Sequence, residues 1–120
     1  MHKYRSLVAW QRAQAVTVLT LKQCDSHYHP RSRALFDQLR RATISIGANI
    51  VEGYALSTPL QFRRHLRIAL GSAAEAEYLT GLIAELQYLP ESTTIEIEAL
   101  LERCMAALHG LIRTTIPLTP

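Results

Sequence analysis

The sequence predicts an all-α protein, an antiparallel up-down-up-down four-helix bundle that forms a single domain over residues 1–120. Four stretches repeat their apolar residues at helical spacing, and only short segments separate them. Long helices joined by such short loops lie antiparallel to their neighbours. With 48% hydrophobic residues, the 120-residue chain can form one core but not a second. Five glycines and five prolines are too few for the many tight turns of a sandwich or barrel, which disfavours an all-β fold.

A proline turn separates the first two helices. The first is expected from about Leu7 to about Gln23, before Pro30, because proline lacks an N–H donor and pushes its predecessor out of the α region. The second is expected from Arg31 or Ser32 to about Gly53. Its apolar residues fall within about 80° of a helical wheel, which predicts one core-facing stripe: Leu35, Leu39, Ala42, Ile46 and Ile50.

The third helix has the clearest start signal in the chain. Thr58 is expected as the N-cap, Pro59 as the first helical residue, and Gln61 as the partner of Thr58 in a capping box. The helix is expected to end at Leu89 and Pro90. Its buried face is expected to contain Phe62, Leu66, Ala69, Ala73, Ala76 and Ile83.

The fourth helix repeats this start signal. Thr93 is the expected cap, and Glu96 lies at the third helical position. The apolar residues that follow recur at alternating spacings of 4 and 3, which is typical of a bundle seam: Ile97, Leu101, Cys104, Leu108 and Leu111.

A polar strip borders the core stripe of the second helix and contains Gln38, Arg41, Ser45, Asn49 and Glu52. Asn49 lies about 20° from Ala42 on the helical wheel, so its amide needs a hydrogen-bond partner, whose absence costs about 1–3 kcal/mol. One interpretation is that Asn49 fixes register or partner choice, as polar seam residues do in coiled coils. The other is that its amide reaches water or caps a backbone group near the helix end.

Both of the first two helices carry apolar side chains on two sides. Ile44 and Val51 lie roughly opposite the core stripe of the second helix. In the first helix, a second apolar side lies away from Trp10 and contains Val8, Val16 and Leu19. A monomer would leave these groups in water, so the pattern predicts a subunit interface and a homo-oligomer. The residues expected to shape the fold and this interface are Trp10, Arg41, Ile44, Ser45, Asn49, Val51 and Glu52.

No motif in the sequence predicts catalytic residues, a cofactor or a metal site. The five histidines form neither a His-Glu-x-x-His nor a Glu-x-x-His pair, and the five glycines form no phosphate loop. Glu75 and Glu77 point about 200° apart on a helix and cannot act as a carboxylate pair. Cys24 and Cys104 could form one disulfide, but their apolar neighbours and a reducing compartment favour buried thiols.

The sequence also gives no sign of a membrane location. No apolar run approaches the ~18 residues that a membrane span needs. The first residues lead into no signal-peptide core or cleavage site. We therefore expect a cytoplasmic protein with no membrane partner.

The basic residues are concentrated in the first part of the chain. Residues 1–70 contain 11 Lys or Arg and 3 Asp or Glu, a net charge of +8, whereas residues 71–120 have a net charge of −5. In the third helix, Arg63, Arg64 and Arg67 project within about 100° of one another, which predicts an outward cationic patch. We expect this patch to bind RNA or DNA phosphates with little sequence preference, because no aromatic residues alternate with it for base stacking.

Arg40 is a further candidate phosphate ligand. Arg40 and Arg41 point about 100° apart on the helix, so only one of them can share the polar strip with Glu52. A salt bridge to Glu52 would be a structural explanation for that arginine. The alternative for all of these arginines is a solvated surface on a protein-interaction scaffold that does not bind nucleic acid.

Three segments of the chain carry the pattern of a known family. They are LVAWQRA at 7–13, QLRRATISIGANIVEG at 38–53, and, in the third helix, Phe62, LRIALGS at 66–72 and Glu75. Together they resemble bacterial four-helix bundle proteins first noted as reading frames in intervening sequences of large-subunit ribosomal RNA genes. The resemblance covers roughly residues 4–90, and the fourth helix matches only in pattern.

That family includes the accessory variability determinant of diversity-generating retroelements, a basic pentameric barrel that associates with a reverse transcriptase and with nucleic acid. The resemblance therefore implies a homopentamer, with RNA or DNA and a reverse transcriptase or ribosomal RNA as candidate partners. It implies no catalytic residue, because the family has no established enzymatic site. We accordingly expect a non-enzymatic accessory protein.

Overall fold

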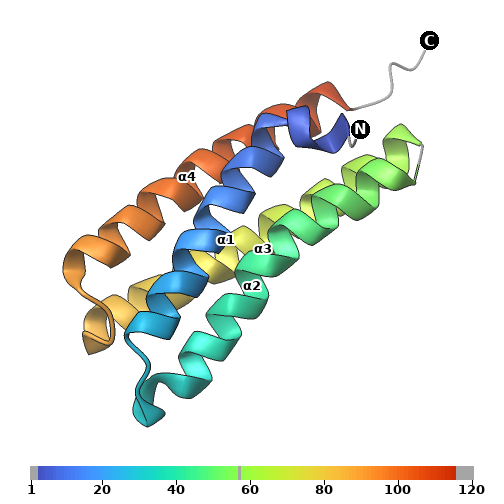
Figure 1. Ribbon diagram of the computed structural model, residues 1–120. Helices are drawn as coiled ribbons and strands as arrows, with labels where there is room; N and C mark the ends of the chain where they lie inside the picture. The colour runs from blue at the N-terminus through green and yellow to red at the C-terminus, as the bar shows by residue number, and fades with distance from the viewer. Residues whose placement is uncertain (1–2, 57, 116–120) are drawn as a thin grey trace.

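The computed structural model describes residues 3–56 and 58–115, and within that part it contains four long helices and no strand (Figure 1). The helices are α1 (Val8–Ser26), α2 (Arg33–Ala55), α3 (Pro59–Leu86) and α4 (Glu91–Thr114). Short 3-10 turns, Lys3–Ser6 and Pro30–Ser32, precede α1 and α2.

The four helices form a closed bundle in which each helix packs against two others. Each helix runs antiparallel to the one before it, and α1 also packs against α4 (Figure 1). The most extensive of these contacts joins α2 to α3. The predicted all-α four-helix bundle is confirmed, and its connections are as short as the sequence indicated, at residues 27–32, 56–58 and 87–90.

Two of the predicted helix starts have different outcomes. At α3 the Thr58 hydroxyl accepts a hydrogen bond from the backbone N–H of Gln61 at 3.2 Å, and Pro59 is the first helical residue, as predicted. At α4 the predicted cap is wrong, because the helix begins at Glu91. Pro90 is the N-cap, with an extended ψ of 143°, and its carbonyl accepts from the backbone N–H of Thr93. Thr93 is thus already inside the helix.

The helix ends also differ from prediction by a few residues. Helix α1 extends to Ser26, past the predicted end near Gln23. Helix α3 ends at Leu86, earlier than predicted, because Gln87 adopts a left-handed conformation with φ 58°. The Gln87 and Tyr88 N–H groups then bond carbonyls of the last helical turn, which closes the helix before Pro90 is reached.

The core runs along the axis of the bundle and contains most of the predicted apolar stripes. In α2, Leu39, Ala42, Ile46 and Ile50 are buried, together with Phe36, while Leu35 is half-buried. In α3 and α4 the predicted residues are buried except for Phe62 and Leu111, which pack against the core from its edge. Among the described residues, no helix is both long and apolar enough to cross a membrane.

Helix α1 faces the core differently from the prediction. Val16, expected on an outward side, is completely buried. The core-facing stripe is made mostly of small residues and contains Ala9, Ala13, Val16, Thr20 and Cys24. The stripe runs between two flanks of larger apolar groups, with Leu19 on one and Trp10 on the other, both half-buried. The two apolar sides read from the sequence are therefore the flanks of one core-facing surface, and of the three residues predicted on the outward side only Val8 is exposed.

Gly53 lies at a close approach between α2 and α3. A Cβ atom built on this buried glycine would lie 2.5 Å from His65 Cβ and 3.2 Å from Phe62 Cδ1. Because His65 Cβ is attached directly to the α3 backbone, relief would require the helices to separate. Gly53 thus sets the spacing between α2 and the first half of α3.

Replacement of Gly53 is expected to separate the two helices. We expect Gly53→Ala to lower the free energy of unfolding by about 1–3 kcal/mol, as overpacked cores do. Gly81→Ala is the matched control, since a Cβ there meets nothing within 4 Å, and we expect it to stabilise α3 by up to about 1 kcal/mol. Denaturant unfolding followed by circular dichroism measures both. Equal effects of the two substitutions would contradict the role assigned to Gly53.

Candidate nucleic-acid interface

The first turns of α3 carry the predicted basic patch. Capping by Thr58 fixes the start of the helix, so the next residues project at defined angles. One shallow depression of about 420 Å³ contains all three predicted arginines with two apolar neighbours, and its lining is Leu60, Arg63, Arg64, Arg67 and Ile68. The three arginines are therefore neighbours on one surface.

The charges of this patch are not neutralised by neighbouring carboxylates. Within residues 3–56 and 58–115, neither Arg63, Arg64 nor Arg67 forms an ion pair. Arg63 is half-buried, and its Nε atom has no hydrogen-bond partner in that part of the chain. The first turn of α3 contains no acidic residue, so the positive end of the helix dipole adds to the field. This arrangement suits an anion with several oxygens, such as a phosphodiester.

Arg40, the fourth predicted phosphate ligand, has a different environment. Its guanidinium donates to Asp37 at 2.7 Å and to Asp25 at 3.0 Å, and its side chain is 23% exposed. These bonds join the end of α1 to α2. The structure therefore does not place Arg40 with the α3 patch, and two carboxylates already neutralise its charge and take one N–H from each of its Nη atoms.

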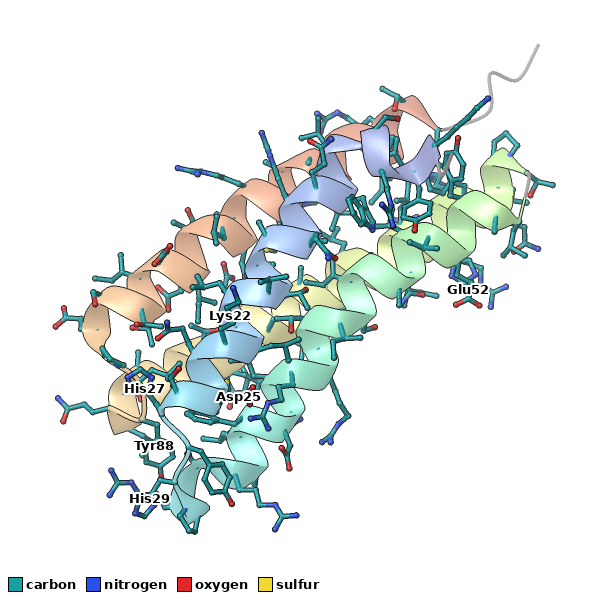
Figure 2. The ribbon with its side chains drawn as sticks, in the orientation of Figure 1. Lys22, Asp25, His27, His29, Glu52 and Tyr88 are labelled. Atoms are coloured by element: carbon teal, nitrogen blue, oxygen red, sulfur yellow. The ribbon has the colours of Figure 1, made fainter. Side chains whose placement is uncertain are left out.

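The salt bridge considered for Glu52 is absent from the described residues. Arg40 bonds acids near the start of α2, whereas Glu52 lies toward the other end of the helix (Figure 2). Arg41 and Glu52 are both exposed, and neither forms an ion pair in the described part of the chain. Eleven residues along a helix separate the two by about 16 Å, which explains why they do not meet.

The rest of the polar strip on α2 faces α3. Gln38 Nε2 donates to Glu75 Oε2 at 3.3 Å, and the hydroxyls of Ser45 and Ser72 lie 2.9 Å apart. Sequence reasoning identified the strip on α2 but missed its partners on α3. The sequence contained a signal for these partners, because Ser72 and Glu75 are polar residues on the side of α3 next to its apolar stripe.

Asn49 combines features of both interpretations made from the sequence. Its Nδ2 group donates to the Ser45 carbonyl at 2.9 Å and contacts the Ser45 hydroxyl at 3.1 Å. Its Oδ1 atom lies 3.1 Å from Nδ1 of His65 on α3. The Ser45 carbonyl can only accept, so the Asn49 amide must turn its Nδ2 group toward Ser45 and its Oδ1 atom toward His65. Because Oδ1 also only accepts, His65 Nδ1 must be the donor. Asn49 therefore bonds the backbone of its own helix and also joins α2 to α3.

The apolar residues predicted at a subunit interface remain partly accessible. Ile44 is 49% exposed and Val8 is 51% exposed, while Val51 is half-buried. Trp10 packs edge-on against Tyr4, with ring centroids 5.4 Å apart, beneath the guanidinium of Arg5. Ile44 and Val8 thus stay available for contact with another subunit.

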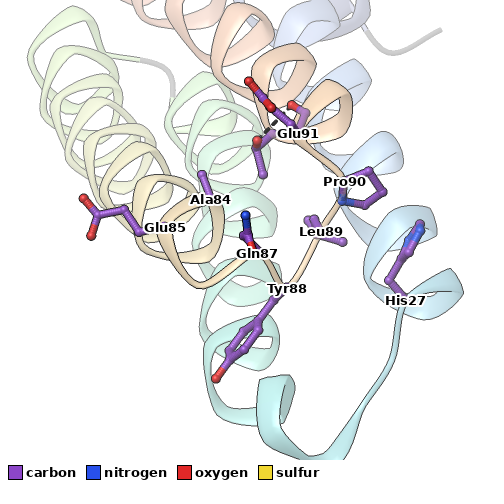
Figure 3. Close-up of a pocket in the computed structure, with 9 residues that line it drawn as sticks. His27, Ala84, Glu85, Gln87, Tyr88, Leu89, Pro90 and Glu91 are labelled. Carbon is purple, nitrogen blue, oxygen red and sulfur yellow. Dashed lines mark hydrogen bonds between the residues drawn. The ribbon is translucent and has the colours of Figure 1, made fainter.

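A second depression lies at the turn between α3 and α4, and its lining contains none of the arginines of the α3 patch. It has a volume of about 620 Å³, and its lining includes His27, Glu85, Gln87, Tyr88 and Glu91 (Figure 3). No group of three or more His, Cys, Asp or Glu side chains in the described residues could hold a metal ion. The hydroxyl of Thr94, which also lines the depression, donates to the backbone carbonyl of Glu91 at 3.0 Å.

Both cysteines are free, buried thiols, as predicted. Burial raises the pKa of Cys24 and of Cys104 to about 11, and Arg40 and Arg12, respectively, only partly oppose that effect. The reactive form of cysteine is the thiolate, so both groups are unreactive at neutral pH.

Comparison with known proteins gives one family and one fold. A sequence model of the 23S rRNA-intervening sequence protein family matches residues 5–110, and this range includes most of α4. A crystal structure of a protein of unknown function from Bacteroides thetaiotaomicron, described as from the S23 ribosomal protein family, is similar with a TM-score of 0.81. It is 23% identical and covers 88% of this chain and 99% of its own, a likeness that shows the fold. No curated protein matches the chain.

The raised thiol pKa values predict slow labelling of both cysteines. In the native protein at pH 7–8, we expect a soluble disulfide reagent to react with Cys24 and Cys104 at least about a hundredfold more slowly than in the denatured chain. Native reactivity should rise only as the pH approaches 11 or the bundle unfolds. Absorbance of the thiolate that the reagent releases measures the labelling rates of the native and the denatured chain. Rapid native labelling at pH 7 would contradict this burial.

Proposed function

Because the chain belongs to the family of 23S rRNA-intervening sequence proteins, we propose that it is a non-enzymatic, homo-oligomeric bundle that binds RNA or DNA phosphates. The observation that carries the proposal is the set of three unpaired arginines, Arg63, Arg64 and Arg67, around one depression on α3. The protein of similar structure from Bacteroides thetaiotaomicron is itself of unknown function.

Recognition through this patch is electrostatic. Guanidinium groups match phosphate geometry with paired N–H donors, and release of counterions from the nucleic acid drives the association. The depression contains aliphatic side chains, Leu60 and Ile68, and no aromatic ring on which a base could stack. We therefore expect contacts to the backbone of the nucleic acid and little sequence preference.

Oligomerisation multiplies this patch. Ile44 and Val8 remain exposed on α2 and α1, and contact with another subunit would bury them. We propose a closed ring, with five subunits as the expected number, that presents the α3 arginines repeatedly to one nucleic acid. A reverse transcriptase or ribosomal RNA is the proposed partner of this assembly.

Loss of the three arginines is expected to weaken nucleic-acid binding specifically. With Arg63, Arg64 and Arg67 all changed to Gln, we expect affinity for a mixed-sequence RNA to fall at least about tenfold at 50 mM salt, with a smaller slope of log affinity against log salt. The matched control changes Lys22, Arg103 and Arg113 to Gln, which removes the same charge from exposed positions elsewhere. Fluorescence anisotropy measures both, with a DNA duplex in parallel.

Two results of this titration would contradict the proposed phosphate-binding site. Equal losses in the test and control variants would indicate a general charge effect without a site. No binding of either nucleic acid at micromolar protein would overturn the proposal, and the chain would then be a protein-interaction scaffold. Thermal stability serves as a check on folding, because the three arginines lie outside the core.

The oligomer has a separate test. Light scattering of the wild-type protein at tens of micromolar is expected to give a mass several times 13.5 kDa, most simply fivefold. Ile44→Asp should reduce that mass while leaving helical circular dichroism intact, because an unpaired carboxylate is costly to bury. Ile95→Asp is the matched control, since Ile95 on α4 is 58% exposed. A wild-type mass of one chain would contradict the oligomer.

A further inference from the structure

The outward face of α3 is divided by charge. Its first half carries the three arginines of the patch, and its second half carries Glu77 and Glu85. Each half has its own shallow depression, and the second, of about 450 Å³, is lined by Ala74, Glu77, Tyr78, Gly81, Leu82 and Glu85. In the described residues, none of these five charged groups forms an ion pair. The two ends of one helix face thus carry opposite, unneutralised charges.

Apolar side chains on the same face are strongly exposed. Leu60 is 68% exposed and Tyr78 is 65% exposed. They belong to an outward stripe whose members recur three or four residues apart: Leu60, Arg64, Arg67, Gly71, Ala74, Tyr78, Leu82 and Glu85. This spacing is the one by which a helix packs lengthwise against another helix. The core-facing stripe of α3 already provides one such seam, so the outward stripe is a second.

The centre of the stripe is narrow. Gly71 is exposed, and a Cβ there would meet nothing within 4 Å, so packing within the chain does not require glycine. Glycine destabilises a helix interior relative to alanine. With Ala74 one turn further on, Gly71 leaves a low point at which another helix backbone can come close.

We infer that a second copy of this chain docks on this face, with α3 antiparallel to α3 around a two-fold axis. Reversing one helix places its arginine half against the glutamate half of the other, whereas a parallel pair would set like charges together. In the register centred between Gly71 and Ala74, Arg67 of each copy lies opposite Tyr78 of the other, where a guanidinium can stack on the ring. The face is thus complementary to itself.

This contact has a consequence for nucleic-acid binding. The pairing covers Arg64 and Arg67, so RNA and the second copy compete for the same surface. That consequence rests on the proposed function, whereas the pairing itself does not. The contact also differs from the proposed ring interface, because Ile44 lies on α2.

The test measures self-association in the Ile44→Asp chain, which removes the ring contact, and in the wild type as a second background. By sedimentation equilibrium we expect the Ile44→Asp chain to reach twice the single-chain mass and to dissociate as salt rises. Arg64→Glu and Glu85→Arg should each weaken pairing about tenfold or more, and their combination should restore it. Glu102→Arg, an exposed change of equal charge on α4, is the matched control.

A further variant separates this inference from the function proposed above. Tyr78→Ala should weaken pairing while leaving RNA affinity at low protein concentration unchanged. A single-chain mass of the Ile44→Asp chain at hundreds of micromolar would overturn the inference, and so would a double charge variant that pairs no better than the single ones. Absence of RNA binding alone would overturn only the nucleic-acid function. Capture of a peptide without self-association would assign the face to another partner and also overturn the inference.

Discussion

The close contact between α2 and α3 is the constraint on which the rest of the bundle depends. Gly53 allows the two backbones to approach, and polar bonds run along the same seam from Gln38 to Asn49. Apolar packing tolerates sliding, but hydrogen bonds are directional, so these bonds fix the axial register. With α2 and α3 placed, the short connections hold α1 beside α2 and α4 beside α3, where α1 and α4 meet and close the bundle.

The same register determines which basic residues are neutralised. Where α1 ends beside α2, Arg40 lies within reach of Asp25 and Asp37 and loses its availability to external anions. The arginines in the first half of α3 have no such neighbours in the described chain, because the acids of α3 lie two or more turns further along the helix. The surface field therefore arises from how charges are distributed along one helix and not from net charge alone.

The two thiols and the polar side chains between α2 and α3 are engaged within the bundle. The thiols are buried and protonated at neutral pH, and the polar side chains between α2 and α3 mostly bond one another. What the bundle offers to other molecules is an exposed helix face with separated charges and apolar groups. Such faces are suited to binding and assembly.

The sequence alone determined the helices, their antiparallel order and most of the core, because periodicity and caps such as Thr58 are local properties. It also identified the α3 arginines, since three neighbours on one helix need no tertiary information. Only the tertiary structure decided that Val16 is buried, that Arg40 is paired and that Asn49 bonds His65. A helical wheel gives relative angles within one helix. Burial and partners depend on how helices are rotated and shifted against each other, which packing across the seams decides.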